Sequence, residues 1–79
     1  MAKVWVKLTF PAKLIKEPIT FQMALKHHLV PNIRRAKVTA TVGEIVMEIK
    51  GAPKDLEKGL KFLKHKGVVI EPIVGDVVA

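Results

Sequence analysis

Three histidines, His27, His28 and His65, are the side chains best suited to hold a metal ion, because the sequence contains no cysteine. His27 and His28 are adjacent, and neighbouring residues of a helix point to different sides, so this pair cannot chelate one ion. His65 is distant in sequence, and no carboxylate is spaced to orient any of the three. The sequence therefore predicts no metal site. The lack of cysteine also excludes disulfides, iron–sulfur clusters and a cysteine nucleophile.

Residues for other kinds of catalysis are equally scarce. The chain has no serine, and none of its threonines has the sequence context of a nucleophile. The 5 glycines are scattered singly, so no loop is built to cradle phosphates. The acidic residues fall in helical turns or on alternating strand faces, where nothing positions them for acid–base work. We therefore expect a protein that is not an enzyme and needs no cofactor.

The densest local positive charge follows Asn32, where Arg34 and Arg35 are adjacent. Such a pair can hold a single carboxylate or phosphate through charge-assisted hydrogen bonds. The alternative is a pair of exposed arginines at the start of a strand. The residues alone leave both interpretations open.

The chain is strongly basic, with 14 Lys and Arg against 7 Asp and Glu and a net charge of +7. This balance invites a nucleic-acid interpretation. However, the basic residues occur in every predicted element, which is typical of solvated faces. An RNA-recognition sheet also needs aromatic residues on its central strands. Here Trp5 is the single aromatic residue on its face of the first strand, and the third strand has none. Nucleic-acid binding is therefore disfavoured and rests on charge alone.

Hydrophobic periodicity predicts six elements in the order strand, helix, strand, strand, helix, strand. Alternating apolar residues define the strands, while prolines and glycines mark the ends of the helices. In a regular strand, Ile33 would point to the opposite face from Ala36 and Val38, so we expect a bulge near Arg34. Gly43 is interpreted as the tight turn of a hairpin. The predicted ranges are Val4–Phe10, Pro18 to about Leu29, Ile33–Val42, Glu44–Lys50, Pro53–Gly67 and Val68–Ile73.

This order predicts an α+β fold, the ferredoxin-like βαββαβ sandwich, in which two helices cover one face of a four-stranded antiparallel sheet. We expect one domain over 1–79, with a core of about 3–73 and a tail at 74–79. Gly59 is expected to let the second helix and the sheet approach each other closely. Phe21 and Leu25, on a second stripe of the first helix, and Trp5 and Val46, on the outer sheet face, are the apolar residues least explained by the core. Such residues commonly mark interfaces, so a homodimer is expected.

No apolar run is long enough to span a bilayer, so membrane insertion is not expected. Lys3 and Lys7 interrupt the N-terminal segment, which lacks the apolar centre of a signal peptide. We therefore expect a cytoplasmic protein.

Several segments in register resemble a known family. These are Leu8-Thr9-Phe10-Pro11, Lys16-Glu17-Pro18-Ile19, Pro31-Asn32-Ile33-Arg34-Arg35-Ala36, and the ending from Leu60 to Gly67 with Val69-Ile70-Glu71-Pro72. Together they resemble the NIL domain, and the resemblance covers nearly the whole chain. The family is named for Asn-Ile-Leu, and this sequence has Arg34 in the third position.

The resemblance implies a ferredoxin-like fold and a binding function. NIL domains occur at the C-terminus of ATPase subunits of methionine importers, where they bind methionine and regulate uptake. They also occur fused ahead of a two-cluster ferredoxin module, and the Asn-Ile-Arg-Arg-Ala form and the tail resemble that branch more closely. Because the chain has no cysteine, electron transfer by this polypeptide is excluded.

The resemblance also implies a site. Asn32 matches the motif asparagine, which contributes to an amino-acid site between two copies of the domain, with Ile33, Phe10, Pro11 and Pro18 as its neighbours. Arg34 or Arg35 would then hold a carboxylate. The leading hypothesis is a regulatory or accessory domain that binds methionine, homocysteine or a related sulfur amino acid. The alternative is a protein-interaction module for an iron–sulfur or sulfur-transfer partner, of ferredoxin type or from a transporter, with RNA binding as a third hypothesis.

Overall fold

A computed structural model describes residues 2–73, and the predicted tail at 74–79 lies outside them. The six predicted elements form in the predicted order, with one short 3-10 turn, η1, added after the first strand. Their bounds are β1 (Ala2–Pro11), η1 (Ala12–Leu14), α1 (Ile19–His27), β2 (Val30–Val38), β3 (Val42–Gly51), α2 (Pro53–Lys66) and β4 (Val69–Pro72).

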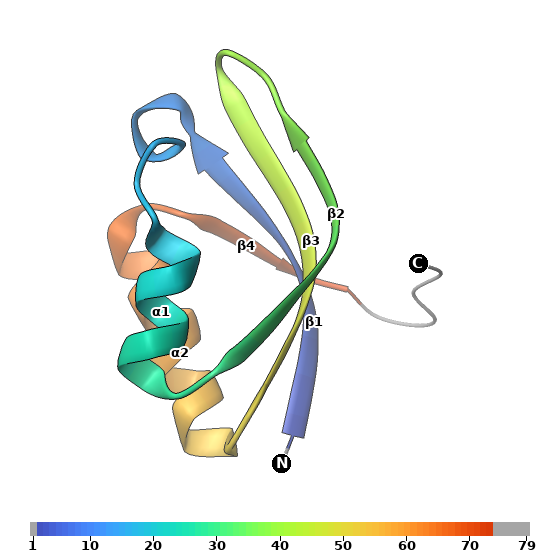
Figure 1. The fold of residues 1–79 in the computed structure, drawn as a ribbon, viewed down its shortest axis with the longest axis vertical. Helices are drawn as coiled ribbons and strands as arrows, with labels where there is room; N and C mark the ends of the chain where they lie inside the picture. Colours follow the sequence, from blue (N-terminus) through green and yellow to red (C-terminus); the bar gives the residue numbers. More distant parts are fainter. Residues whose placement is uncertain (1, 74–79) are drawn as a thin grey trace.

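The four strands form one antiparallel sheet in the order β2-β3-β1-β4. Both helices lie on the same side of this sheet (Figure 1). Strands β1 and β3 are central, and β2 and β4 are the two edges. This arrangement is the ferredoxin-like sandwich, which confirms the fold class predicted from the periodicity.

The core lies between the sheet and the helices. Alternation along β1 turns Val6, Leu8 and Phe10 toward the helices and leaves Trp5, Lys7 and Thr9 on the outer face. The helices contribute one apolar stripe each, and that stripe packs on the strands. The most deeply buried side chains are Leu8, Ile19, Met23, Met47, Ile49 and Leu63.

Leu29, in the short link between α1 and β2, fills the space between two glycines. A Cβ atom added to Gly59 would lie 2.3 Å from Leu29 Cδ1, and one added to Gly51 would lie 2.3 Å from Leu29 Cδ2. The absence of a side chain at Gly59 therefore permits a close approach, but the neighbours are Leu29 and, on α1, Met23, and not the sheet that the sequence predicts. Gly67 ends α2 at a φ of 104°, which confirms the left-handed cap.

Strand β2 begins at Val30, three residues earlier than the predicted Ile33. The strand therefore includes Pro31, which the prediction placed outside it. A proline removes a ladder donor, but an edge strand tolerates this where the missing N–H would face solvent. The expected bulge is confirmed, since the register between β2 and β3 shifts between Ile33 and Arg35. The strand ends at Val38 and does not reach Val42 as predicted.

The prediction that Gly43 forms the hairpin turn is wrong. Gly43 belongs to β3 and pairs with Val38, and the chain reverses over residues 39–41. The Thr39 hydroxyl accepts hydrogen bonds from the backbone N–H groups of Thr41 at 3.3 Å and Val42 at 3.1 Å. Thr39 also donates its own N–H to the Val42 carbonyl at 2.8 Å. A threonine side chain therefore holds a turn that the sequence pattern attributed to glycine.

Helix α1 buries one of its two apolar stripes. Ile19 and Met23 are buried, whereas Phe21 is 65% exposed and Leu25 is 69% exposed. The helix ends at His27, and His28 adopts a left-handed conformation with a φ of 56°, two residues before β2 begins. The second stripe is thus a surface feature of the described chain.

Candidate ligand-binding site

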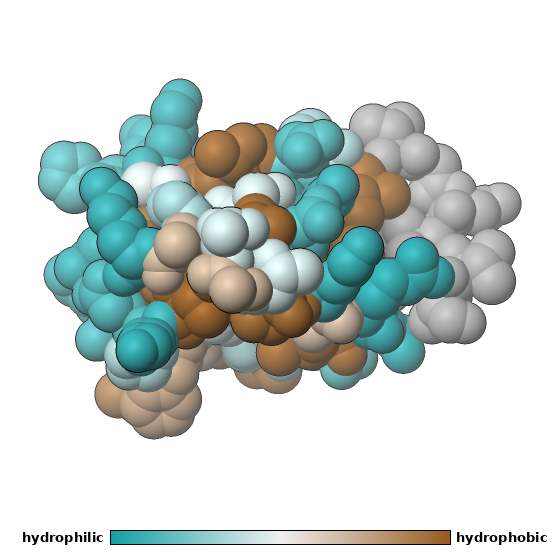
Figure 2. All heavy atoms as spheres, turned by 90° about the horizontal axis from the view of Figure 1, so that it is seen from above, coloured by the Kyte–Doolittle hydropathy of each residue, from teal (hydrophilic) through white to brown (hydrophobic). Residues whose placement is uncertain are grey.

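A hollow opens where the end of β1, the η1 turn, the start of α1 and the edge strand β2 meet. Its volume is about 230 Å³, and its lining is almost entirely apolar, with Glu17 and Thr20 as the polar side chains. Figure 2 looks at this end of the molecule and shows apolar surface between hydrophilic side chains. Apolar lining residues include Phe10, Ile15, Pro18, Phe21, Ile33 and Ile45.

The hollow exists because the helices stop short of the edge strand. Ile33 and Val38 pair with Met47 and Gly43, so they lie on the helix-facing side of the sheet. They are nevertheless 54% and 60% exposed, because no helix covers them. An apolar concavity with few polar groups is the usual form of a small-molecule site.

The predicted site residues divide between the two faces of the sheet. Phe10, Pro18 and Ile33 line the hollow. Pro11 follows Phe10 and pairs with Val42 beside the lining.

The polar members lie on the other face. Asn32 pairs with Glu48 and Arg35 with Val46, both outer-face residues of β3. The Arg34 guanidinium carbon lies 5.4 Å from the centre of the Trp5 ring. Adjacent residues of a strand point to opposite faces, which is why Asn32 and Ile33 separate. All three polar side chains are exposed.

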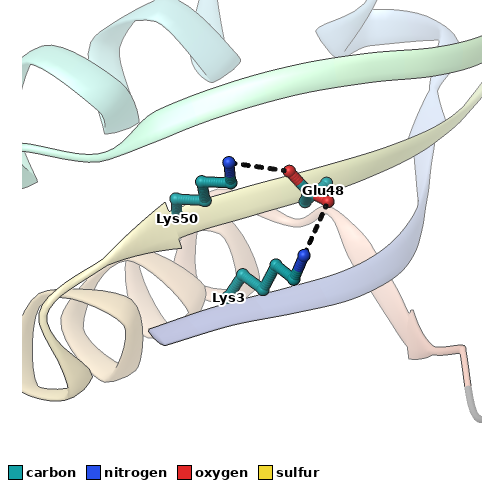
Figure 3. A network of polar contacts seen from close by, with 3 residues as sticks. All are labelled: Lys3, Glu48 and Lys50. Atoms are coloured by element: carbon teal, nitrogen blue, oxygen red, sulfur yellow. Dashed lines mark ion pairs between the residues drawn. The ribbon is translucent and has the colours of Figure 1, made fainter. Parts of the chain in front are cut away.

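The outer face carries ion pairs that the sequence did not reveal. Glu48 is only 5% exposed, and its carboxylate lies 3.8 Å from Lys3 Nζ and 3.7 Å from Lys50 Nζ (Figure 3). These distances are those of ion pairs and are too long for good hydrogen bonds. Strand alternation suggests a solvated glutamate. Lys50, two residues along the same strand, is the sequence signal for a paired one, whereas Lys3 is brought near by the β1–β3 register.

A second pair joins Lys7 Nζ to Glu44 at 2.8 Å. The hydrogen bond from Lys7 lowers the pKa of Glu44 below its ordinary value of 4.5, and the same bond raises the pKa of Lys7. The basic residues of the outer face are thus partly neutralised, and Trp5 lies under Arg34. This arrangement lacks the aromatic platform of an RNA-binding sheet.

The histidines stand apart from the hollow. The His27 ring meets Phe62 edge-on at 5.6 Å, and His28 and His65 are exposed. Among residues 2–73, no three His, Cys, Asp or Glu side chains gather closely enough to hold a metal ion. Over the same range, no helix combines the length and apolar character needed to cross a membrane.

Comparison with known proteins decides the family. The model of the NIL domain matches residues 4–72. The chain belongs to the NIL domain family. Among curated proteins, it is 32% identical over 76 residues to the methionine import ATP-binding protein MetN of Protochlamydia amoebophila (strain UWE25). That match covers 91% of this chain and 22% of MetN, so the chain spans about a fifth of the relative's length.

Solved structures share the ferredoxin-like fold of this chain. The C-terminal domain of an ABC transporter ATP-binding protein from Enterococcus faecalis superposes with a TM-score of 0.81, 18% identity, and coverage of 92% of this chain and 86% of that one. A de novo designed protein, Foldit4, has a TM-score of 0.53 at 11% identity, covering 90% of this chain and 91% of that one. At these identities the likeness concerns the fold alone.

The motif that names the family lies on the edge strand. In this NIL domain Asn32, Ile33 and Arg34 occupy successive positions of β2, immediately before and within the bulge. Ile33 faces the hollow, and Asn32 faces the opposite side. The motif therefore presents an apolar and a polar group on either side of one free strand edge.

Proposed function

We propose that this NIL domain is a non-catalytic regulatory or accessory module that binds methionine or a related sulfur amino acid. The observation that carries the proposal is the apolar hollow of about 230 Å³ beside the exposed family motif. Its size suits one amino-acid side chain rather than a drug-sized ligand, which needs roughly 300–1,000 Å³. The name of the relative, a methionine import ATP-binding protein, supports the choice of ligand and makes a transporter subunit the proposed partner.

The ligand lies across the free edge of β2 in this proposal. Its thioether chain enters the hollow against Phe10, Pro18 and Ile33, and Pro11 follows Phe10 in β1 outside the lining. Its polar end meets the Asn32 amide, which makes no hydrogen bond within residues 2–73. Arg34 or Arg35 supplies the positive charge for the carboxylate through a charge-assisted hydrogen bond.

A second copy completes the site. Strand β2 is a nine-residue edge in which only Pro31 is even partly buried. Its large apolar side chains Val30, Ile33 and Val38 are more than half exposed. A free, apolar edge strand is a template for pairing with another chain. We therefore propose a homodimer at the β2 edge, in which the bound amino acid lies between the two copies and the partner copy covers the open side of the hollow.

Calorimetry and thermal denaturation with methionine, homocysteine and S-adenosylmethionine test this function. A ligand present at 100-fold over its Kd stabilises the fold by about 2.7 kcal/mol. For a domain of this size, that corresponds to a rise in Tm on the order of 10 °C. No heat and no rise in Tm with any of the three compounds would refute the proposal.

Substitutions locate the site. Ile33→Ser and Asn32→Ala should each weaken binding by about five- to thirtyfold, since each removes an apolar or hydrogen-bonding contact of about 1–2 kcal/mol. Val69→Ser is the matched control. Like Ile33, Val69 is an exposed β-branched apolar residue on an edge strand, with 56% of its surface exposed, but it lies on β4 at the opposite edge of the sheet. Equal losses in Ile33→Ser and Val69→Ser would contradict the proposed location.

A further inference from the structure

A second concavity lies between the two helices, away from the β2 edge. It has a volume of about 380 Å³ and is lined by Gln22, Leu25, Lys26, Phe62 and Lys66. We call these five residues the interhelical groove. Helices α1 and α2 pack against each other, and Figure 1 shows them together on one side of the sheet. No part of the proposed amino-acid site contributes to this groove.

Phe62 forms the apolar centre of the interhelical groove. Two ammonium groups lie near its ring, with Lys26 Nζ 5.5 Å and Lys66 Nζ 5.6 Å from the ring centre. His27 packs on the same ring from the α1 side. Cation–π attraction holds the lysines close to the aromatic ring. Leu25, which is 69% exposed, adds a second apolar side chain.

The two lysines of the groove have no acidic partner among residues 2–73. The ion pairs in that range engage Lys3, Lys7, Lys50 and Lys61. Helix α1 contains no acidic residue. On α2, Glu57 pairs with Lys61 at 3.3 Å, and neither of these residues lines the groove. The groove is therefore positive and apolar at once, whereas on the outer sheet face lysines are paired with glutamates.

We propose that the interhelical groove is the docking site of an acidic amphipathic helical segment of another protein. An apolar side chain of that segment packs on Leu25 and Phe62, and its carboxylates on either side pair with Lys26 and Lys66. A free inorganic anion would satisfy the lysines but would leave Leu25 exposed. Helix-in-groove recognition with charge complementarity fits both features.

The test uses a designed peptide as the probe and the 79-residue chain as the target. The peptide is helical, about 15 residues long, with two leucines one turn apart and glutamates on both sides of them. A second peptide has glutamine in place of every glutamate. Fluorescence anisotropy gives the affinities, and NMR chemical-shift changes locate the contact. We expect shifts at Gln22, Leu25 and Phe62, and binding at low salt about tenfold tighter for the glutamate peptide than for the glutamine peptide.

Paired charge reversals separate local docking from general attraction to a basic protein. Lys26→Glu with Lys66→Glu should weaken peptide binding by about tenfold or more. Lys54→Glu with Lys58→Glu changes the net charge equally at exposed α2 positions outside the groove lining and should leave binding within about threefold. Leu25→Ala should weaken binding, because its exposed side chain is removed without affecting the core.

Three results would overturn the docking proposal: equal weakening by both charge-reversed pairs, equal affinity of the two peptides, or shifts confined to other surfaces. Binding of phosphatidylglycerol vesicles through Lys26 and Lys66 without binding of the peptide would also overturn it. Methionine calorimetry on the Lys26→Glu, Lys66→Glu variant should match that of the original chain. The docking proposal and the proposed amino-acid function can therefore fail separately.

Discussion

Gly59→Ala is expected to destabilise the fold, although alanine is the better helix former. At an unobstructed position within a helix, this exchange would stabilise by about 1 kcal/mol. Here the new Cβ would lie 2.3 Å from Leu29 Cδ1 and 3.4 Å from Met23 Cγ, where ordinary contact begins at 3.4 Å. Leu29 must therefore retreat by 3.4 − 2.3 = 1.1 Å. Its other methyl group already lies against Gly51, so that direction is closed.

The size of the stability change follows from two opposing contributions, the gain in helix propensity and the steric cost at Leu29. Overpacking of a core costs about 1–3 kcal/mol, which exceeds the gain in helix propensity. We expect a net loss of about 1 kcal/mol in the free energy of unfolding, or a fall in Tm of roughly 4–8 °C for a domain of this size. Urea unfolding followed by circular dichroism measures the first quantity, and calorimetry the second.

A double-mutant cycle with Leu29→Ala makes the reasoning refutable. Leu29→Ala alone should cost about 2–5 kcal/mol, because it leaves a cavity. With the leucine methyl groups removed, Gly59→Ala keeps its propensity gain and should now stabilise by about 1 kcal/mol. The sign of the Gly59→Ala effect therefore reverses between the two backgrounds. The same sign and size in both would show that Leu29 does not govern the effect.

Two further predictions concern the β2–β3 turn and the outer face. Thr39→Ala should lower the free energy of unfolding by roughly 0.5–1.5 kcal/mol, since it removes the acceptor for two backbone N–H groups, and urea unfolding should show a smaller loss for Thr41→Ala. Equal losses would refute the assigned turn chemistry. Lys7→Gln should raise the pKa of Glu44 toward 4.5, measured by carboxyl NMR titration. Because this pKa is lowered by folding, the pair stabilises above about pH 4.5 and the effect is lost as pH falls through the folded pKa. An unchanged Glu44 titration in Lys7→Gln would contradict the pairing.

The fold was predictable because its signals are local and mutually consistent. Alternation in β1 and β3 and the spacing of Leu56 and Leu63 in α2 each identify one buried face. The bulge near Arg34 could be anticipated from the parity of Ile33 alone. The start of β2 could not, because whether a strand tolerates Pro31 depends on its being an edge, and the order of strands is a tertiary property.

Part of the candidate site could be assembled from the sequence, but its arrangement could not. Phe10, Pro18 and Ile33 do line one hollow, although they are far apart in sequence. That Asn32 and Arg35 face the other side follows from the strand register, which the sequence pattern did not determine through the bulge. The exposure of Phe21 and Leu25, by contrast, is already indicated by the second apolar stripe of the helix, and the structure confirms it. The paired state of Glu48 depends on its cross-strand neighbours.

The unequal lengths of the two sheet margins limit how this protein can polymerise. One margin is the nine-residue β2, and the other is the four-residue β4, which ends in Pro72 and so lacks one backbone donor. A head-to-tail stack, in which each copy offers β2 to the β4 of the next, would match nine residues to four and leave most of the longer strand unsatisfied. Joining β2 to β2 about a two-fold axis matches equal lengths and leaves no further long margin to extend. The asymmetry therefore favours a closed pair over an open fibre.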